Sequence, residues 1–234
     1  MYLYIVRHGD PDYATDSLTE LGKKQAEAVG RRLYKSGVTE IYSSPNGRAV
    51  ATAKPLCDSI GKEPIIKMAF SEDFAYGHFY YLDSKGMHWS FEKRAEILGN
   101  DTVFRSPDAF SHGIYADEQL AQEGYAELCD ECDGLLTELG YKRTGVGNGY
   151  EAISPNDKKV AVFCHEGAGL HLLSRILGFS PLTLPATFDF GHTGVTIIQF
   201  SGEGVVFPRC LCLSDLSHIY AEGLPMTYNN YFEI

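Results

Sequence analysis

The sequence predicts an α/β protein in which a mostly parallel sheet lies between two layers of helices, a three-layer α/β/α arrangement. Three observations lead to this prediction. Short apolar runs of strand character alternate with segments whose apolar residues recur at helical spacing. Turn residues directly follow the first and a late apolar run, as at the carboxyl ends of parallel strands. Residues 74–116 break the pattern, so we interpret them as an inserted lid or cap within a single domain spanning 1–234.

The amino-terminal third alternates strand and helix in a regular order. Residues 3–6 are apolar and precede Arg7-His8-Gly9, which predicts a strand that ends in a loop. Thr19 is a favoured cap residue, and the apolar residues after it recur at helical spacing up to Gly37. The next three predicted elements are a strand at 41–43, a helix from 47 to 61 and a third strand at 65–69.

The rest of the chain is less regular. The insertion is rich in Tyr, Phe, His and Gly, which predicts short helices rather than another strand–helix unit. Helical spacing returns at 118–139, and 143–157 predict a polar, Gly-rich loop. A strongly apolar strand is then expected at 160–164, a helix at 169–177, a hairpin with strands at 195–200 and 205–213, and an irregular tail at 228–234.

Composition and charge exclude several classes of protein. Of the 234 residues, 44% are hydrophobic and 22% are charged, which is typical of a globular chain. The chain has 20 basic and 31 acidic residues, and its formal net charge of −11 argues against a general nucleic-acid or anionic-membrane binder. No apolar run approaches the roughly 20 residues that cross a bilayer. We therefore expect a cytoplasmic protein without nucleic-acid or membrane partners, and we leave its oligomeric state open.

The six cysteines, at 57, 129, 132, 164, 210 and 212, are expected to be reduced thiols. A chain of this length has enough apolar residues to build a core without disulfides. The pairs Cys129-x-x-Cys132 and Cys210-x-Cys212 lie in a helical and a strand-like pattern, which makes a poor zinc quartet. We expect no metal and no other cofactor.

Two histidines follow strand ends far apart in the sequence. His8 and His165 each come directly or almost directly after an apolar strand. Ligands of open α/β sheets bind beyond the carboxyl ends of the strands. The two histidines could therefore meet at one pocket.

These residues carry a resemblance to a known family. Arg7-His8-Gly9, the pattern Ser43-Ser44-Pro45-x-x-Arg48-Ala49-x-x-Thr52-Ala53 in the next strand–helix unit, and His165 resemble the histidine phosphatase superfamily, which includes the cofactor-dependent phosphoglycerate mutases. The resemblance implies a metal-independent phosphomonoesterase. Such an enzyme would hydrolyse a small phosphorylated metabolite through a phosphohistidine intermediate and release inorganic phosphate. The alternatives are a phosphoglycerate mutase-type phosphotransferase and a phospho-ligand-binding module without turnover.

The chemistry of the same residues agrees with phosphoryl transfer. Arg7 and Arg48 would bind phosphate oxygens with planar guanidinium groups, and His165 would complete the ring of donors. His8 would be the nucleophile, because a neutral imidazole can attack phosphorus and form a phosphohistidine. Gly9 would let the backbone approach the phosphate closely.

The leaving group needs a proton donor, for which three carboxyl groups are candidates. Phe70-x-Glu72 resembles the signature that carries the acid in the mutase-like branch, so Glu72 is our choice. Asp73 is its neighbour, and Glu166 occupies the place of the acid in the acid phosphatase branch. Asp10-Pro11-Asp12 departs from the mutase-like pattern after the first histidine, which leaves the substrate open.

Other histidines and aromatic residues are assigned no catalytic role. His192 lies between Gly191 and Thr193 and is interpreted as a turn residue, while His171 and His218 are interpreted as structural. The insertion offers either a substrate wall or a packed cap, formed by Phe74, Tyr76, Phe79, Tyr80 and Tyr81.

Overall fold

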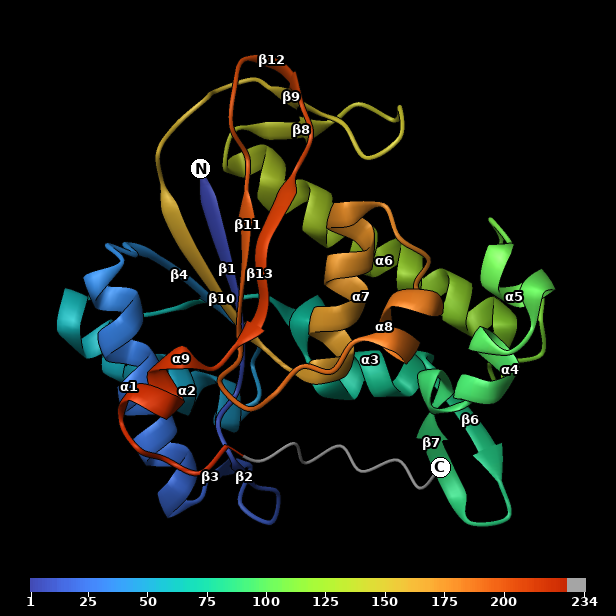
Figure 1. The fold of residues 1–234 in the computed structure, drawn as a ribbon, viewed down its shortest axis with the longest axis horizontal. Coiled ribbons are helices and arrows are strands. Elements are labelled where there is room, and N and C mark those ends of the chain that lie inside the picture. Colours follow the sequence, from blue (N-terminus) through green and yellow to red (C-terminus); the bar gives the residue numbers. More distant parts are fainter. Residues whose placement is uncertain (227–234) are drawn as a thin grey trace.

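The computed structural model describes residues 1–226, and its centre is a six-stranded sheet with helices on both faces (Figure 1). The strand order is β13-β11-β1-β10-β4-β5, in which β1, β10, β4 and β5 run parallel and β11 runs antiparallel to its neighbours β1 and β13. The predicted α/β class and mostly parallel sheet are confirmed. The six strands are β1 (Tyr2–Arg7), β4 (Glu40–Ser43), β5 (Ile65–Ile66), β10 (Lys159–Cys164), β11 (Val195–Gln199) and β13 (Arg209–Asp215).

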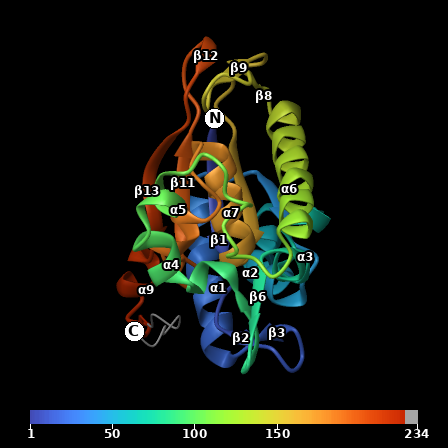
Figure 2. The same cartoon turned by 90° about the vertical axis from the view of Figure 1, so that its right-hand side faces the viewer.

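The two faces of the sheet have separate apolar cores. Tyr4 and Val6 of β1 pack with Leu33 of α1 (Glu20–Lys35) and with α2 (Gly47–Ile60). The alternate residues Leu3 and Ile5 pack on the opposite face, against α6 (Glu118–Glu138) and α7 (Glu166–Leu177). Because side chains of a strand alternate between faces, the apolar run of β1 supplies both cores at once. Figure 2 shows α6 and α7 on one side of the sheet.

The loop after His8 is held by the start of α1. The Thr19 hydroxyl accepts a hydrogen bond from the Gly22 amide at 3.0 Å, as expected for the cap of this helix. A Cβ atom on Gly22 would lie 2.1 Å from the Asp10 carbonyl oxygen. Only glycine fits this close approach of helix and loop, so Gly22 helps to place the segment that carries His8.

The insertion has an apolar cluster of its own. It includes Phe79, Phe91 and Ile97, which pack with Ala168 of α7 and Ala186 of α8 (Thr183–Thr187). The segment therefore covers one end of α7. Its elements are α3 (Glu72–His78), β6 (Tyr80–Asp83), β7 (Gly86–Trp89), the 3₁₀ turn Ser90–Glu92, α4 (Arg94–Leu98) and α5 (Asp101–Arg105).

The sequence predictions for the two edge strands of the sheet, β5 and β13, were partly wrong. The strand expected at 65–69 spans only Ile65–Ile66, and a 3₁₀ turn at Met68–Phe70 follows, because Ala69 and Phe70 are buried in the core while the edge strand is exposed. The hairpin forms between β11 and β13, but its second strand does not begin at 205. Residues Gly204–Val206 form β12, which pairs with β9 (Tyr150–Ala152) instead. Pro208 separates β12 from β13 and has no amide hydrogen to donate to a strand pair.

The loop predicted at 143–157 was also partly wrong. Tyr150 is fully buried, and its strand β9 pairs with β8 (Tyr141–Arg143) and with β12 in a small second sheet. The polar residues around it concealed this short strand. The helix expected at 169–177 begins earlier, at Glu166, with His165 at its cap position.

The remaining elements are short. None of the helices among the described residues has the length and apolar character needed to cross a bilayer. All six cysteines are free thiols in the structure. The stretch 228–234 lies outside the described residues. The short elements are β2 (Pro11–Asp12), β3 (Ser17–Leu18) and α9 (Ser217–Ala221).

Candidate active site

His8 and His165 meet at the carboxyl ends of two adjacent strands. The parallel register of β1 and β10 places Arg7 beside Cys164, so the next residue of each strand enters the same space. The ring centroids of His8 and His165 lie 5.0 Å apart, and both side chains are buried. The two histidines thus lie side by side, as their places after strand ends suggested.

The protonation state of His8 follows from its contacts. His8 Nδ1 lies 2.7 Å from the carbonyl oxygen of Gly9, which can only accept a hydrogen bond. Nδ1 therefore carries the proton, and the lone pair of the neutral ring is on Nε2. Burial, and then the charges of Arg7 and His165, hold the pKa of His8 well below its ordinary value. The ring stays neutral and can act as a nucleophile through Nε2.

Arg7 and Arg48 come from different elements and are both buried. Arg7 Nη1 donates to the carbonyl oxygen of Phe190 at 2.6 Å. Arg48 lies in the first turn of α2, where its Nη1 donates to Asp16 Oδ1 at 2.5 Å. The second carboxylate oxygen of Asp16 accepts from the Gly47 amide at 2.6 Å. Asp16 therefore holds Arg48 and the start of α2 together.

Four buried polar atoms of this site have no hydrogen-bond partner among the described residues. They are Nε of Arg7, Nε of Arg48, Nδ1 of His165 and Oε2 of Glu72. Buried polar atoms are nearly always hydrogen-bonded in native proteins. Their concentration around His8 indicates a place built to bind a polar ligand.

His165 is oriented by a chain of hydrogen bonds. The Ser44 hydroxyl donates to Asn46 Oδ1 at 3.0 Å and lies 2.8 Å from His165 Nε2. Because the hydroxyl hydrogen is used for Asn46, Ser44 accepts from His165 Nε2–H. His165 Nδ1 then faces Glu72 Oε2, at 3.8 Å. Burial, with Arg48 and Arg7 nearby, lowers the pKa of His165 well below its ordinary value.

Glu72 has the properties of an acid that is protonated near neutral pH. It is the first residue of α3, and burial raises its pKa to about 7, although Arg7 and Arg48 act in the opposite direction. The backbone N–H groups of Gly167 and Ala168, at the start of α7, also face the carboxyl and favour its ionised form. A carboxyl group with a pKa near the working pH can both donate and accept a proton.

The two alternative acids are held by other groups. Asp73 is exposed and its Oδ2 accepts from Asn46 Nδ2 at 2.9 Å. Glu166 Oε2 lies 3.3 Å from Arg7 Nη1, and burial raises the pKa of Glu166 to about 7. Glu166 therefore has a suitable pKa, but its carboxyl contacts Arg7 and is hydrogen-bonded to Asp189, whereas Glu72 lies beside His165 Nδ1.

Sequence reasoning missed Asn46 and underestimated His192. Asn46 Oδ1 accepts from Ser44, from Ser71 and from the Glu72 amide, so it ties the turn before α2 to the start of α3. In the sequence, Asn46 is one of four consecutive turn-forming residues, Ser44-Pro45-Asn46-Gly47, and nothing else marks it. His192 does lie in a turn, but it is buried, with its ring centroid 5.5 Å from that of His8.

Arg48 and Glu72 of the site line a cavity of about 470 Å³, whose lining does not include His8, Arg7 or His165. Trp89 from the insertion closes one side of it and lies so near the first turn of α7 that a Cβ atom on Gly167 would be 2.2 Å from its ring. Of the five aromatic residues considered as a wall, Tyr76 lines this cavity and Phe79 is part of the packed cap. The lining residues are Tyr13, Asp16, Asn46, Arg48, Glu72, Asp73, Tyr76 and Trp89.

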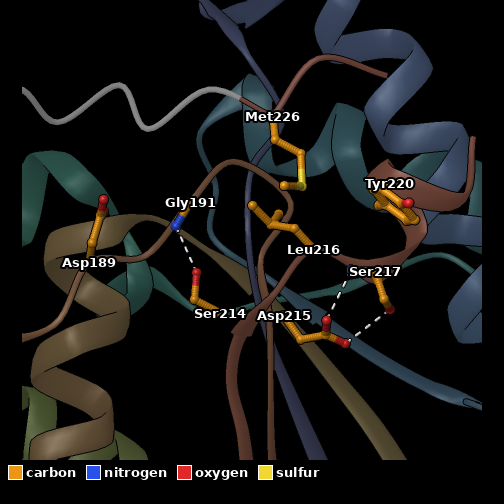
Figure 3. Close-up of a pocket in the computed structure, with 8 residues that line it drawn as sticks. All are labelled: Asp189, Gly191, Ser214, Asp215, Leu216, Ser217, Tyr220 and Met226. Carbon is orange, nitrogen blue, oxygen red and sulfur yellow. Dashed lines mark hydrogen bonds between the residues drawn. The ribbon is translucent and has the colours of Figure 1, made fainter. Parts of the chain in front are cut away.

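A second cavity, of about 410 Å³, borders the loop that carries His192 (Figure 3). The Gly191 amide donates to the Ser214 hydroxyl there, at 2.8 Å. None of the predicted catalytic residues lines this cavity. Among the described residues, no group of three or more His, Cys, Asp or Glu side chains is placed to hold a metal ion.

Parts of the sequence match proteins named as phosphatases and as phosphoglycerate mutases. A protein named "Putative phosphoserine phosphatase 2" from Hydrogenobacter thermophilus is 34% identical over 94 residues, which cover 34% of this chain and 46% of that protein. A "Probable phosphoglycerate mutase GpmB" from Yersinia pestis is 39% identical over 70 residues, which cover 26% of this chain and 33% of that protein. The matched regions thus span less than half the length of these relatives.

Solved structures share the fold over almost the whole chain. Phosphoserine phosphatase from Entamoeba histolytica, solved in complex with 3-phosphoglyceric acid, has a TM-score of 0.60 at 22% identity and covers 93% of this chain and 98% of that chain. A mycobacterial glucosyl-3-phosphoglycerate phosphatase has a TM-score of 0.58 at 21% identity, with coverage of 91% and 98%. The family model described as the histidine phosphatase superfamily (branch 1) matches residues 3–211. The chain therefore belongs to the histidine phosphatase superfamily.

Proposed function

We propose that this protein is a phosphomonoesterase that hydrolyses a small phosphorylated metabolite through a phosphohistidine at His8. The observation that carries the proposal is the set of unpartnered buried atoms around the His8 ring, above all Nε of Arg7 and Nε of Arg48. Two guanidinium groups beside a neutral imidazole match the charge and the shape of a phosphoryl group. Superfamily membership supports phosphatase or phosphomutase chemistry in general.

In the first step, the Nε2 lone pair of His8 attacks phosphorus in line with the leaving group. The bond from phosphorus to the ester oxygen breaks, and the protonated Glu72 carboxyl gives its proton to that oxygen. Arg7 and Arg48 stabilise the charge that spreads over the phosphoryl oxygens. The Gly9 carbonyl holds Nδ1–H throughout, so the imidazole keeps its orientation.

In the second step, water attacks the phosphorus of phospho-His8. The Glu72 carboxylate takes a proton from the water, the phosphorus–Nε2 bond breaks, and inorganic phosphate leaves. Both Glu72 and His8 return to their starting states. His165 donates a hydrogen bond to the phosphate when its ring is protonated. Burial disfavours this protonated form, and a bound phosphate dianion favours it.

The insertion at 74–116 supplies the lid in this proposal. Tyr76 and Trp89 lie against each other with ring centroids 4.9 Å apart, and both line the cavity. Substrate specificity in such folds depends on loops and lids rather than on the phosphate cradle. The cytoplasmic location, the absence of nucleic-acid and membrane partners and the absence of a metal requirement stay predictions from the sequence.

Hydrolysis and mutase activity can be separated by product analysis. We expect release of inorganic phosphate from simple phosphomonoesters, unchanged when a metal chelator is present, because the proposed charge stabilisation comes from arginine side chains. Incubation with 3-phosphoglycerate is expected to yield no more than a trace of 2-phosphoglycerate. Efficient interconversion without phosphate release would favour the phosphotransferase. Tight phosphate binding without either reaction would favour the binding module.

A further inference from the structure

The cavity of about 470 Å³ beside Arg48 carries less positive charge than the proposed phosphate-binding pair, Arg7 and Arg48. Of the described residues that line it, only Arg48 is cationic, and Arg48 is bound to Asp16. These two charges cancel to a first approximation. Glu72 serves as the proton donor in the proposed reaction. Asp73 is the carboxylate that remains.

Asp73 has no cationic partner among the described residues. Its Oδ2 accepts a hydrogen bond from the neutral amide of Asn46 at 2.9 Å, and its side chain is exposed to the cavity mouth. Asn46 thereby fixes the carboxylate without neutralising it. Because Ser71 caps α3 with a hydrogen bond from the Asp73 amide, the backbone of Asp73 is fixed as well.

Aromatic rings form the rest of the wall around this carboxylate. The Tyr76 hydroxyl donates to the Met87 carbonyl oxygen at 2.5 Å, and the Trp89 ring stacks on Phe91 at 5.2 Å, so the two rings that line the cavity are held in place. Tyr13, at the rim, lies 5.5 Å from the Arg48 guanidinium. Aromatic faces attract cations and provide no partner for an anion.

We propose that the substrates of this enzyme are phosphomonoesters whose leaving group carries a positive charge, such as the phosphate ester of an amino alcohol. The inference rests on the proposed phosphatase function. The phosphate would bind at Arg7 and Arg48, and the ammonium group would lie between Asp73 and the rings of Tyr76 and Trp89. The solved neighbours include a complex with 3-phosphoglyceric acid, whose carboxylate is a second anion. Among the described residues that line the cavity of this chain, none is an unpaired cation that could bind such a group.

Three alkyl phosphates of similar length test the inference: 2-aminoethyl phosphate, propyl phosphate and phosphoglycolate. Their leaving groups are cationic, neutral and anionic. We expect kcat/KM to fall by about tenfold at each step in this order, as one charge pair near the surface of a protein would produce. Added sodium chloride should reduce the preference for 2-aminoethyl phosphate, because salt screens an exposed charge pair.

Variants locate the source of the preference. Asp73→Asn should bring the ratio of kcat/KM for 2-aminoethyl phosphate to that for propyl phosphate close to one, because the variant removes the charge and keeps the shape. Asp83→Asn is the matched control, since Asp83 is an exposed carboxylate of the same insertion that does not line the cavity, and it should keep the ratio of the parent.

The outcomes separate this inference from the function on which it rests. Hydrolysis of propyl phosphate with equal or faster turnover of phosphoglycolate would overturn the charge preference and leave the phosphatase intact. A ratio that Asp73→Asn does not change would also overturn it. If the parent hydrolyses none of the three compounds, the proposed function fails. The charge preference is then tested separately, by measuring the binding of 2-aminoethyl phosphate and phosphoglycolate by calorimetry. Tighter binding of phosphoglycolate than of 2-aminoethyl phosphate would overturn it there.

Discussion

Replacing His8 by alanine should lower kcat/KM for every phosphomonoester by at least about 1,000-fold, because the nucleophile is lost. The Gly9 carbonyl holds the neutral ring in the orientation that leaves the lone pair on Nε2. The arginines remain in the variant. We therefore expect phosphate binding to persist while turnover disappears, as measured by phosphate release and by calorimetry with inorganic phosphate.

The His8 variant needs controls because the side chain is buried. His8→Asn keeps a group that can donate to the Gly9 carbonyl, and it should be as inactive as His8→Ala. His112→Ala removes a partly exposed histidine of the insertion and should keep the activity of the parent. Thermal unfolding of all three variants reports on the fold. Activity within about tenfold of the parent in a folded His8→Ala protein would exclude this nucleophile.

Replacing Glu72 by glutamine should lower kcat for an alkyl phosphate by about 100-fold or more, because the alkoxide then leaves without a proton donor. The loss should be much smaller for p-nitrophenyl phosphate, whose leaving group needs no proton. The pH dependence gives a second measure. With its pKa raised to about 7, Glu72 is protonated below that pH and loses the proton as pH rises through it. Activity of the parent on alkyl phosphates should therefore fall above pH 7, and Glu72→Gln should not show this fall.

Glu166 is the matched control for this prediction, since burial raises its pKa to about 7 as well. Its carboxylate contacts Arg7, so Glu166→Gln should act mainly on the placement of that guanidinium and raise KM. The fall in activity above pH 7 should be retained. If instead Glu166→Gln removes the fall and Glu72→Gln retains it, the two carboxyl groups have exchanged roles.

The parts of the site that lie at strand ends could be predicted from the sequence. An apolar strand followed by Arg7-His8-Gly9, and another followed by His165, implied a common pocket, because parallel strands present their carboxyl ends at one edge of the sheet. The position of Arg48 in the first turn of α2 followed from the turn-forming residues Ser44-Pro45-Asn46-Gly47 before the predicted helix. Each of these residues is marked by a pattern in its own short segment, and the fold then brings the segments together.

The parts that depend on contacts between distant loops could not be predicted in this way. Asn46 has the composition of an ordinary turn residue, and its hydrogen bonds to Ser71 and Glu72 appear only when α3 folds against the turn. Asp16 lies in a polar loop, and nothing near it in the sequence points to Arg48. The strand at Tyr150–Ala152 was concealed by the polar residues around it, and one of its two partners, β12, comes from a segment about fifty residues away.

The most direct test of the central claim is to trap the phosphoenzyme. The parent is mixed with 2-aminoethyl phosphate or p-nitrophenyl phosphate, quenched in alkali within the first turnover, and digested for mass spectrometry, since phosphohistidine survives in base. The account predicts a phosphoryl group on His8 that forms before free phosphate appears and is absent from His8→Ala. Release of phosphate with no labelled residue, or with the label on a residue other than His8, would contradict it.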